Sequence, residues 1–117
     1  MSGTLERGVT TAEMAAPSAV VWIDGVRAQV ARVSREGRIS TCEITRGWMR
    51  DLQYLAQVAR VIGDRQRVLI LGPSSVRLAL EREYVAMYRR PDRLVDVEPA
   101  GPVSLEELVD RVRALAA

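Results

Sequence analysis

The sequence predicts an α/β domain in which three helices cover the faces of a five-stranded mixed sheet. Up to residue 45, short β-type runs are separated by turns, and beyond it helical apolar stripes alternate with short apolar runs. The resulting order is β-β-β-α-β-α-β-α. Strands that follow crossover helices are expected to lie parallel to the first strand. A length of 117 residues suits one such domain.

Three β-type segments open the domain, which we expect to span 19–117 behind a flexible leader at 1–18. The run VVWID at 20–24 leads into an Asp-Gly turn, and RAQVARV at 27–33 returns as the second strand. RISTCEI at 38–44 alternates like a third antiparallel strand, which we place at an edge. The leader lacks the basic and apolar regions of a signal peptide.

The periodicity then becomes helical. A first helix is predicted from Trp48, Leu52, Leu55, Ala59 and Ile62, which recur at spacings of four and three. RVLIL at 67–71 is the continuous apolar run of a strand covered on both faces.

Two more helices flank a last strand, LVDV at 94–97. The second helix has as its inner face Val76, Ala79, Leu80, Tyr84, Met87 and Tyr88, with Pro91 just beyond its end. The third opens with the capping box Ser104–Glu107. Its expected buried stripe is Leu105, Leu108, Val109, Val112 and Leu115.

Composition excludes several kinds of catalytic site. The chain has no histidine, so neither a Ser-His-acid triad nor a Cys-His pair can form. The single Cys42 allows no intrachain disulfide and no structural zinc site, and it is expected to be a small buried side chain. We therefore expect no cofactor, no metal and no enzymatic activity.

The element order is that of the ribonuclease H-like fold, whose enzymes need several carboxylates around two metal ions. Asp24 ends the first strand and Asp51 begins the first helix, but the strand at 67–71 ends in Gly-Pro with no acid. This is too little for a nuclease, and Asp24 reads as a turn residue. A pair of carboxylates for glycosidic or proteolytic chemistry would have to come from Glu81, Glu83, Asp96 and Glu98, and no feature of the sequence places two of them in one cleft.

The loop Gly72-Pro73-Ser74-Ser75 is the strongest candidate for an anion site. A glycine turn between a buried strand and a helix N-terminus can bind phosphate through free N–H groups, and Arg77 lies in the first turn of that helix. The alternative is that Ser74 or Ser75 simply caps the helix. The loop matches neither the P-loop nor the G-x-G-x-x-G pattern.

All seventeen basic residues are arginine, which suits phosphate or carboxylate binding, but fifteen acids offset them. A role in RNA binding therefore requires arginines gathered on one face; the alternative is a solvated surface of mixed charge. Of the two tryptophans, Trp22 is expected in the core. Trp48, with Met49, either packs or marks a surface for a protein partner.

Several of these segments together resemble a known family. V-V-W-I-D at 20–24, Arg27-Ala28, L-I-L-G-P at 69–73 with Arg77 behind it, and V-D-V-E at 95–98 carry the likeness. They resemble the middle domain of the archaeo-eukaryotic release factor and Pelota superfamily, most of all its stand-alone bacterial members described as translational machinery proteins. The resemblance implies a ribonuclease H-like domain without nuclease chemistry.

In release factors of this family a Gly-Gly-Gln loop between the third strand and the first helix promotes hydrolysis of peptidyl-tRNA. This chain has only Thr45-Arg46-Gly47 there, so that activity is not carried over. The expected function is a non-catalytic, cytoplasmic, translation-associated factor of the rescue or hibernation type, which binds the ribosome or ribosomal RNA. The candidate contacts are Gly72, Ser74, Ser75, Arg77, Arg27, Arg32, Arg38, Arg89 and Arg90. The alternative is a protein–protein adaptor or homodimer with no nucleic-acid role.

Overall fold

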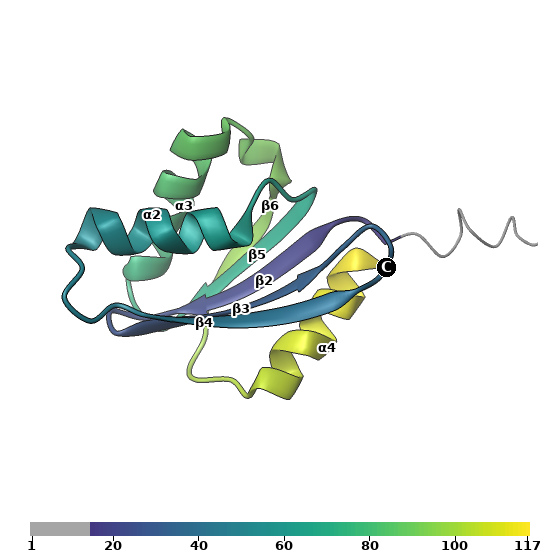
Figure 1. Cartoon of the computed structure of the whole chain (residues 1–117), viewed down its shortest axis with the longest axis horizontal. Helices are drawn as coiled ribbons and strands as arrows, with labels where there is room; N and C mark the ends of the chain where they lie inside the picture. Colours follow the sequence, from purple (N-terminus) through teal and green to yellow (C-terminus); the bar gives the residue numbers. More distant parts are fainter. Residues whose placement is uncertain (1–14) are drawn as a thin grey trace, which may run out of the picture.

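The computed structural model describes residues 15–117, which form one five-stranded sheet with helices on both faces (Figure 1). The strands are β2 (Ser18–Ile23), β3 (Arg27–Val33), β4 (Ile39–Thr45), β5 (Arg67–Gly72) and β6 (Leu94–Pro99). The helices are α2 (Asp51–Ile62), α3 (Val76–Tyr88), α4 (Leu105–Ala116) and the short 3-10 helix η1 (Pro91–Arg93). None of the helices in this part of the chain is long and apolar enough to cross a membrane.

The sheet is mixed, as the element order predicted. The strand order is β4-β3-β2-β5-β6; β3 pairs antiparallel with both β2 and β4, and β5 pairs parallel with β2 and β6. β2, β4, β5 and β6 therefore run in one direction. We call the edge where these four strands end the carboxyl edge of the sheet, and the opposite edge the amino edge.

Each face of the sheet has its own core. On one face α2 and α3 pack over the sheet, around fully buried side chains such as Ile23, Ile70, Leu80 and Tyr84. On the other face α4 alone covers Trp22, and its own side chains Leu108 and Val112 are buried against the sheet. Because β2 and β5 are covered on both faces, every residue of β2 and all but the first of β5 are buried. The predicted two-sided burial of β5 is thus confirmed.

Most of the predicted leader lies outside the described residues, but its last four residues belong to the domain. Ser18 is the first residue of β2 and is fully buried. The N–H of Ala15 donates to the carbonyl of Arg35 at 3.0 Å, and that of Ala16 to the carbonyl of Ala116 at 3.2 Å. Residues 15–17 therefore belong to the domain, because they join the turn after β3 to the end of α4.

Two of the predicted helical stripes were partly wrong. Trp48 lies in the turn before α2 rather than on the helix, and Leu52 is 71% exposed. Tyr54 and Val58 are buried on α2 in addition to the later residues of the stripe. On α4, Leu105 is exposed. In each helix the exposed leucine lies in the first turn, where spacing alone does not show which side chains reach the sheet.

Candidate anion-binding surfaces

Gly72 is a packing residue at the end of β5. A Cβ atom on Gly72 would lie 2.3 Å from the carbonyl oxygen of Ile23, at the neighbouring end of β2. Its own carbonyl accepts hydrogen bonds from the N–H of Ala100, at 2.9 Å, and from Nη1 of Arg77, at 3.5 Å. The close approach of two backbones explains the glycine without any ligand.

The rest of this loop mainly satisfies its own polar groups. Oγ of Ser74 accepts a hydrogen bond from the N–H of Val76 at 3.3 Å, while Ser75 precedes α3 without a side-chain capping bond. The guanidinium of Arg77 turns back and donates to the carbonyl of Ser74 at 2.8 Å. The loop therefore favours a structural role: Ser75 stands at the N-cap position without a side-chain bond, and Ser74 satisfies the first N–H of the helix.

A hollow of about 200 Å³, which the sequence did not predict, opens beside this loop at the carboxyl edge. It lies between the N-terminal turns of α2 and α3 and is lined by Gly25, Arg46, Asp51, Tyr54, Leu55, Ser75, Val76 and Ala79. Arg46 forms an ion pair with Asp51, which neutralises the only cation lining the hollow. The hollow therefore offers an anion no uncompensated charge.

Tyr54 anchors the floor of this hollow. Its hydroxyl donates to the carbonyl of Asp24 at 2.9 Å, and the guanidinium of Arg46 lies 5.9 Å from its ring centroid. Burial, and secondarily the negative charge of Asp24, raises the pKa of Tyr54 above its ordinary value. The phenol stays protonated at neutral pH and serves as a structural donor.

Asp24 has the turn role that its position before Gly25 predicted. Its Oδ1 accepts hydrogen bonds from the N–H groups of Val26 and Arg27 at 2.8 and 2.9 Å. Gly25 has no positive φ, so the carboxylate of Asp24 rather than a left-handed glycine organises the turn. Within residues 15–117, no three acidic or cysteine side chains lie close enough together to hold a metal ion.

Arg27 lies on the same half of the sheet and is already engaged. Its Nη1 lies 3.4 Å from Oε2 of Glu43, and its guanidinium stands 5.2 Å from the ring centroid of Trp22. Trp22 is buried as predicted, and its indole N–H donates to the carbonyls of Ala100 and Gly101. Arg27 therefore contributes to packing on β2 and β3.

The amino edge has a different charge balance. Three segments meet there: the end of β3 with the β3–β4 turn (32–38), the residues leading into β5 (63–67), and the connection from α3 to β6 (89–93). These segments carry eight arginines and three acids. We call the eight the amino-edge arginine set: Arg32, Arg35, Arg38, Arg65, Arg67, Arg89, Arg90 and Arg93. The acids are Glu36, Asp64 and Asp92.

Four members of the set, Arg32, Arg65, Arg67 and Arg93, are held in place by backbone carbonyls. Arg32 donates to the carbonyl of Val61 at 3.0 Å, Arg65 to that of Ile62 at 2.9 Å, and Arg93 to that of Arg65 at 2.9 Å. The first two carbonyls belong to the last turn of α2, where the helix dipole favours cations. Burial, and then the charge of Arg32, lowers the pKa of Arg65. Arg67 donates to the carbonyls of Leu115 and Ala117 at 2.7 and 2.9 Å, and Arg93 also forms ion pairs with Asp64 and Asp92.

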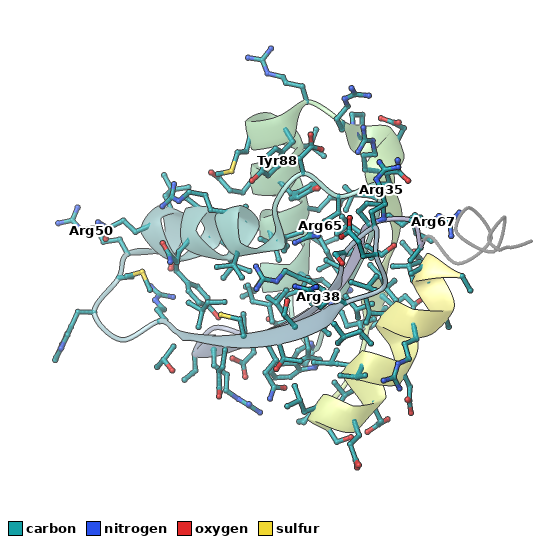
Figure 2. All side chains as sticks on the ribbon, turned by 45° about the vertical axis from the view of Figure 1, so that its right-hand side comes forward. Arg35, Arg38, Arg50, Arg65, Arg67 and Tyr88 are labelled. Carbon is teal, nitrogen blue, oxygen red and sulfur yellow. The ribbon has the colours of Figure 1, made fainter. Side chains whose placement is uncertain are left out.

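Four other members point into solvent: Arg35, Arg38, Arg89 and Arg90 are exposed and form no ion pair with any described residue. Figure 2 shows Arg35, Arg65 and Arg67 on one side of the molecule and Arg50 at the opposite end. Of the nine residues proposed from the sequence, four lie along the amino edge, Arg32 and Arg38 toward its β4 border and Arg89 and Arg90 toward its β6 border. The other five, on the carboxyl half, do not join them. Arg35, Arg65, Arg67 and Arg93 also lie at this edge but were not predicted from the sequence as contact residues.

Trp48 and Met49, proposed as a partner surface, are placed differently from each other. Trp48 is fully exposed in the turn between β4 and α2, whereas Met49 is half-buried against the core under α2. Gly47, with φ of +56°, allows the tight turn that presents the indole. Only Trp48 is therefore available to a partner.

No protein-family profile matches the chain, and no curated protein matches it in sequence. Solved structures do match it in fold. Pelota of Archaeoglobus fulgidus superposes with a TM-score of 0.63 at 12% identity, over 88% of this chain and 32% of that protein. Pelota of Thermoplasma acidophilum gives 0.62 at 18% identity, over 90% of this chain and 34% of its own. The chain thus spans about a third of these proteins and shares the fold of that part, which confirms the Pelota-like resemblance.

Proposed function

We propose that this protein is a non-catalytic, translation-associated factor that binds ribosomal RNA through its amino-edge arginine set. The observation that carries the proposal is the gathering of eight arginines against three acids on three segments that are distant in sequence. Arginine forks bind phosphate in a bidentate manner, and a basic stripe along one edge is the electrostatic footprint of a nucleic-acid binder. The Pelota-like fold supports a role in translation.

The internal contacts of the set support this reading. Arg32, Arg65 and Arg93 are fixed by backbone carbonyls, so they lose little freedom when a phosphate arrives. An arriving phosphate would also relieve the repulsion between Arg32 and Arg65. The exposed arginines on either side, among them Arg38 and Arg90, extend the positive surface along the edge.

The same contacts support a binding role rather than catalysis. The acids near the carboxyl-edge hollow are engaged, Asp24 in its turn and Asp51 with Arg46. The one phenol there, Tyr54, donates to a backbone carbonyl and stays protonated. A general base needs an acceptor that is free to take a proton from the substrate, and these engaged groups do not provide one.

Co-sedimentation with purified ribosomes across a range of salt concentrations tests the proposal. The parent protein should bind at low salt and lose affinity steeply as salt rises, because each phosphate contact releases counterions. A variant with Arg35→Gln, Arg38→Gln, Arg89→Gln and Arg90→Gln should bind about 100-fold more weakly. Its log–log salt slope should fall by about 3 to 4, at roughly 0.9 per lost contact.

The matched control is Arg50→Gln with Arg82→Gln. Both residues are exposed, neither pairs with a described acid, and neither lies on the amino edge. This variant should bind as the parent does, apart from the small effect of net charge. Equal losses per arginine removed in the two variants would show that only net charge matters, and absence of parent binding at low salt would refute the proposal.

Trp48 favours one other candidate, an adaptor that contacts a protein. A fully exposed indole at the tip of a tight turn is a typical anchor for a protein pocket. In the same assay, Trp48→Ala would abolish binding while the arginine variants kept it, and binding would respond little to salt. Such a result would show that the partner bound by this chain is a protein rather than RNA.

A further inference from the structure

β4 forms an open border of the sheet. Its seven residues, Ile39–Thr45, pair with β3 along their whole length in one unbroken register. Among the described residues nothing pairs with the other side of β4, which lies at the border of the sheet in Figure 1. A long, regular edge strand presents a row of free N–H and C=O groups that can template another strand.

The pairing with β3 determines which backbone groups point outward. The N–H of Ser34 donates to the carbonyl of Arg38, and that of Arg46 to the carbonyl of Val26. Since hydrogen-bonded pairs alternate along an antiparallel ladder, the even-numbered residues of β4 bond to β3. The outward N–H and C=O groups therefore belong to Ile39, Thr41, Glu43 and Thr45.

The opposite border, β6, is protected by contrast. It carries Asp96, Glu98 and Pro99, and its register with β5 shifts between Val68 and Leu69. Charges, proline and irregular pairing are the usual devices that prevent edge-to-edge association. β4 has a single charge, Glu43, which Arg27 from the neighbouring strand compensates.

We propose that β4 pairs antiparallel with β4 of a second copy of this chain, about a two-fold axis at Cys42. This register is the one in which all seven residues of each strand find a partner. Ile39 then lies opposite Thr45 of the other copy, and Thr41 opposite Glu43, in hydrogen-bonded pairs made by the outward groups. The result is a continuous ten-stranded sheet across the dimer.

Side-chain direction and charge agree with this register. Cys42 and Ile44 face the core under α2 and α3, whereas Ile39 faces the core under α4, and pairing about Cys42 keeps each on its own side. A register centred on Glu43 would set two carboxylates directly opposite each other, which is destabilising. The charge pattern of the edge thus suits a second copy in one alignment.

Cys42 provides the test, since it is the only cysteine. Directly opposite residues in a non-hydrogen-bonded pair have Cα atoms about 4.5 Å apart, within the span of a disulfide. Diamide should therefore oxidise the two Cys42 thiols of a dimer to one disulfide, taking up both hydrogens itself. A covalent species of twice the 13.0 kDa chain mass should form in high yield, without dependence on protein concentration once the dimer is populated.

The matched control carries Ser40→Cys in a Cys42→Ser background. Residue 40 lies on the same side of β4 but faces Ile44 of the other copy, so this variant should cross-link at least ten-fold more slowly. Equal rates would indicate collisional cross-linking and overturn the register.

Light scattering without oxidant tests the association itself. We expect a concentration-dependent dimer, because a single strand pair buries less than the ~1,600 Å² of a standard interface. Thr41→Pro removes one outward N–H and no bond to β3, so it should give a monomer with an unchanged circular dichroism spectrum. A parent that stays monomeric at millimolar concentration would refute the proposal, independently of ribosome binding.

Discussion

Replacing Gly72 by alanine is the most direct test of whether this glycine packs the sheet or cradles an anion. The new Cβ would lie 2.3 Å from the carbonyl oxygen of Ile23, whereas real Cβ contacts are essentially never under 3.0 Å. The ends of β2 and β5 would have to separate by about 0.7 Å, and neither contact atom belongs to a flexible side chain. Overpacking of this kind costs about 1–3 kcal/mol.

The same shift disturbs the hydrogen bond from the N–H of Ala100 to the carbonyl of Gly72, which is worth about 1 kcal/mol. We therefore expect Gly72→Ala to lower the free energy of unfolding by about 3 kcal/mol. Thermal unfolding followed by circular dichroism should show a midpoint about 15 °C lower, at roughly 5 °C per kcal/mol for a domain of this size.

Gly101→Ala is the matched control, because no atom lies within 4 Å of its new Cβ and the residue has no positive φ. It should unfold within a few degrees of the parent. If Gly72→Ala were equally harmless while ribosome binding fell, the glycine would serve a ligand and the packing argument would fail.

Two further predictions concern stability. Burial raises the pKa of Tyr54 and of Tyr84 above the ordinary value of 10.0, so the folded chain holds these protons more tightly than the unfolded chain. The contribution of these protonated phenols to the free energy of unfolding is complete below pH 10 and is lost as the pH rises through the folded-state pKa. Tyr54→Phe should therefore weaken the decline of the urea midpoint between pH 10 and 12. Leu108→Ala should cost about 3 kcal/mol in urea unfolding, since Leu108 is fully buried under α4. Leu105→Ala, at a 45% exposed position of the same helix, should cost less than about 1 kcal/mol, and similar losses at both sites would contradict the assigned face of α4.

The fold was predictable because its signals are local. The strand over Arg27–Val33 and the box between Ser104 and Glu107 are confirmed as the sequence predicted them, the latter by reciprocal hydrogen bonds of 3.1 Å. The mixed sheet followed from element order alone. The role of Gly72 was not predictable in this way, because the atom that requires glycine is a carbonyl of Ile23, on a strand that becomes its neighbour only after folding.

The location of the arginines could likewise be predicted only in part from local sequence signals, but the predicted topology adds information. After β4, each helix carries the chain from the carboxyl edge back to the amino edge, where the next strand begins. Residues that precede the strands therefore lie along the same edge of the sheet. Arg65 precedes β5, Arg93 precedes β6, and Arg38 precedes β4 beside the paired ends of β2 and β3. Arg27 and Arg46, at the opposite edge, lie beside Glu43 and Asp51. Position relative to the strands, rather than the number of arginines, therefore separates an edge with excess positive charge from a neutral one. Once a topology is predicted, that position can be counted along the sequence.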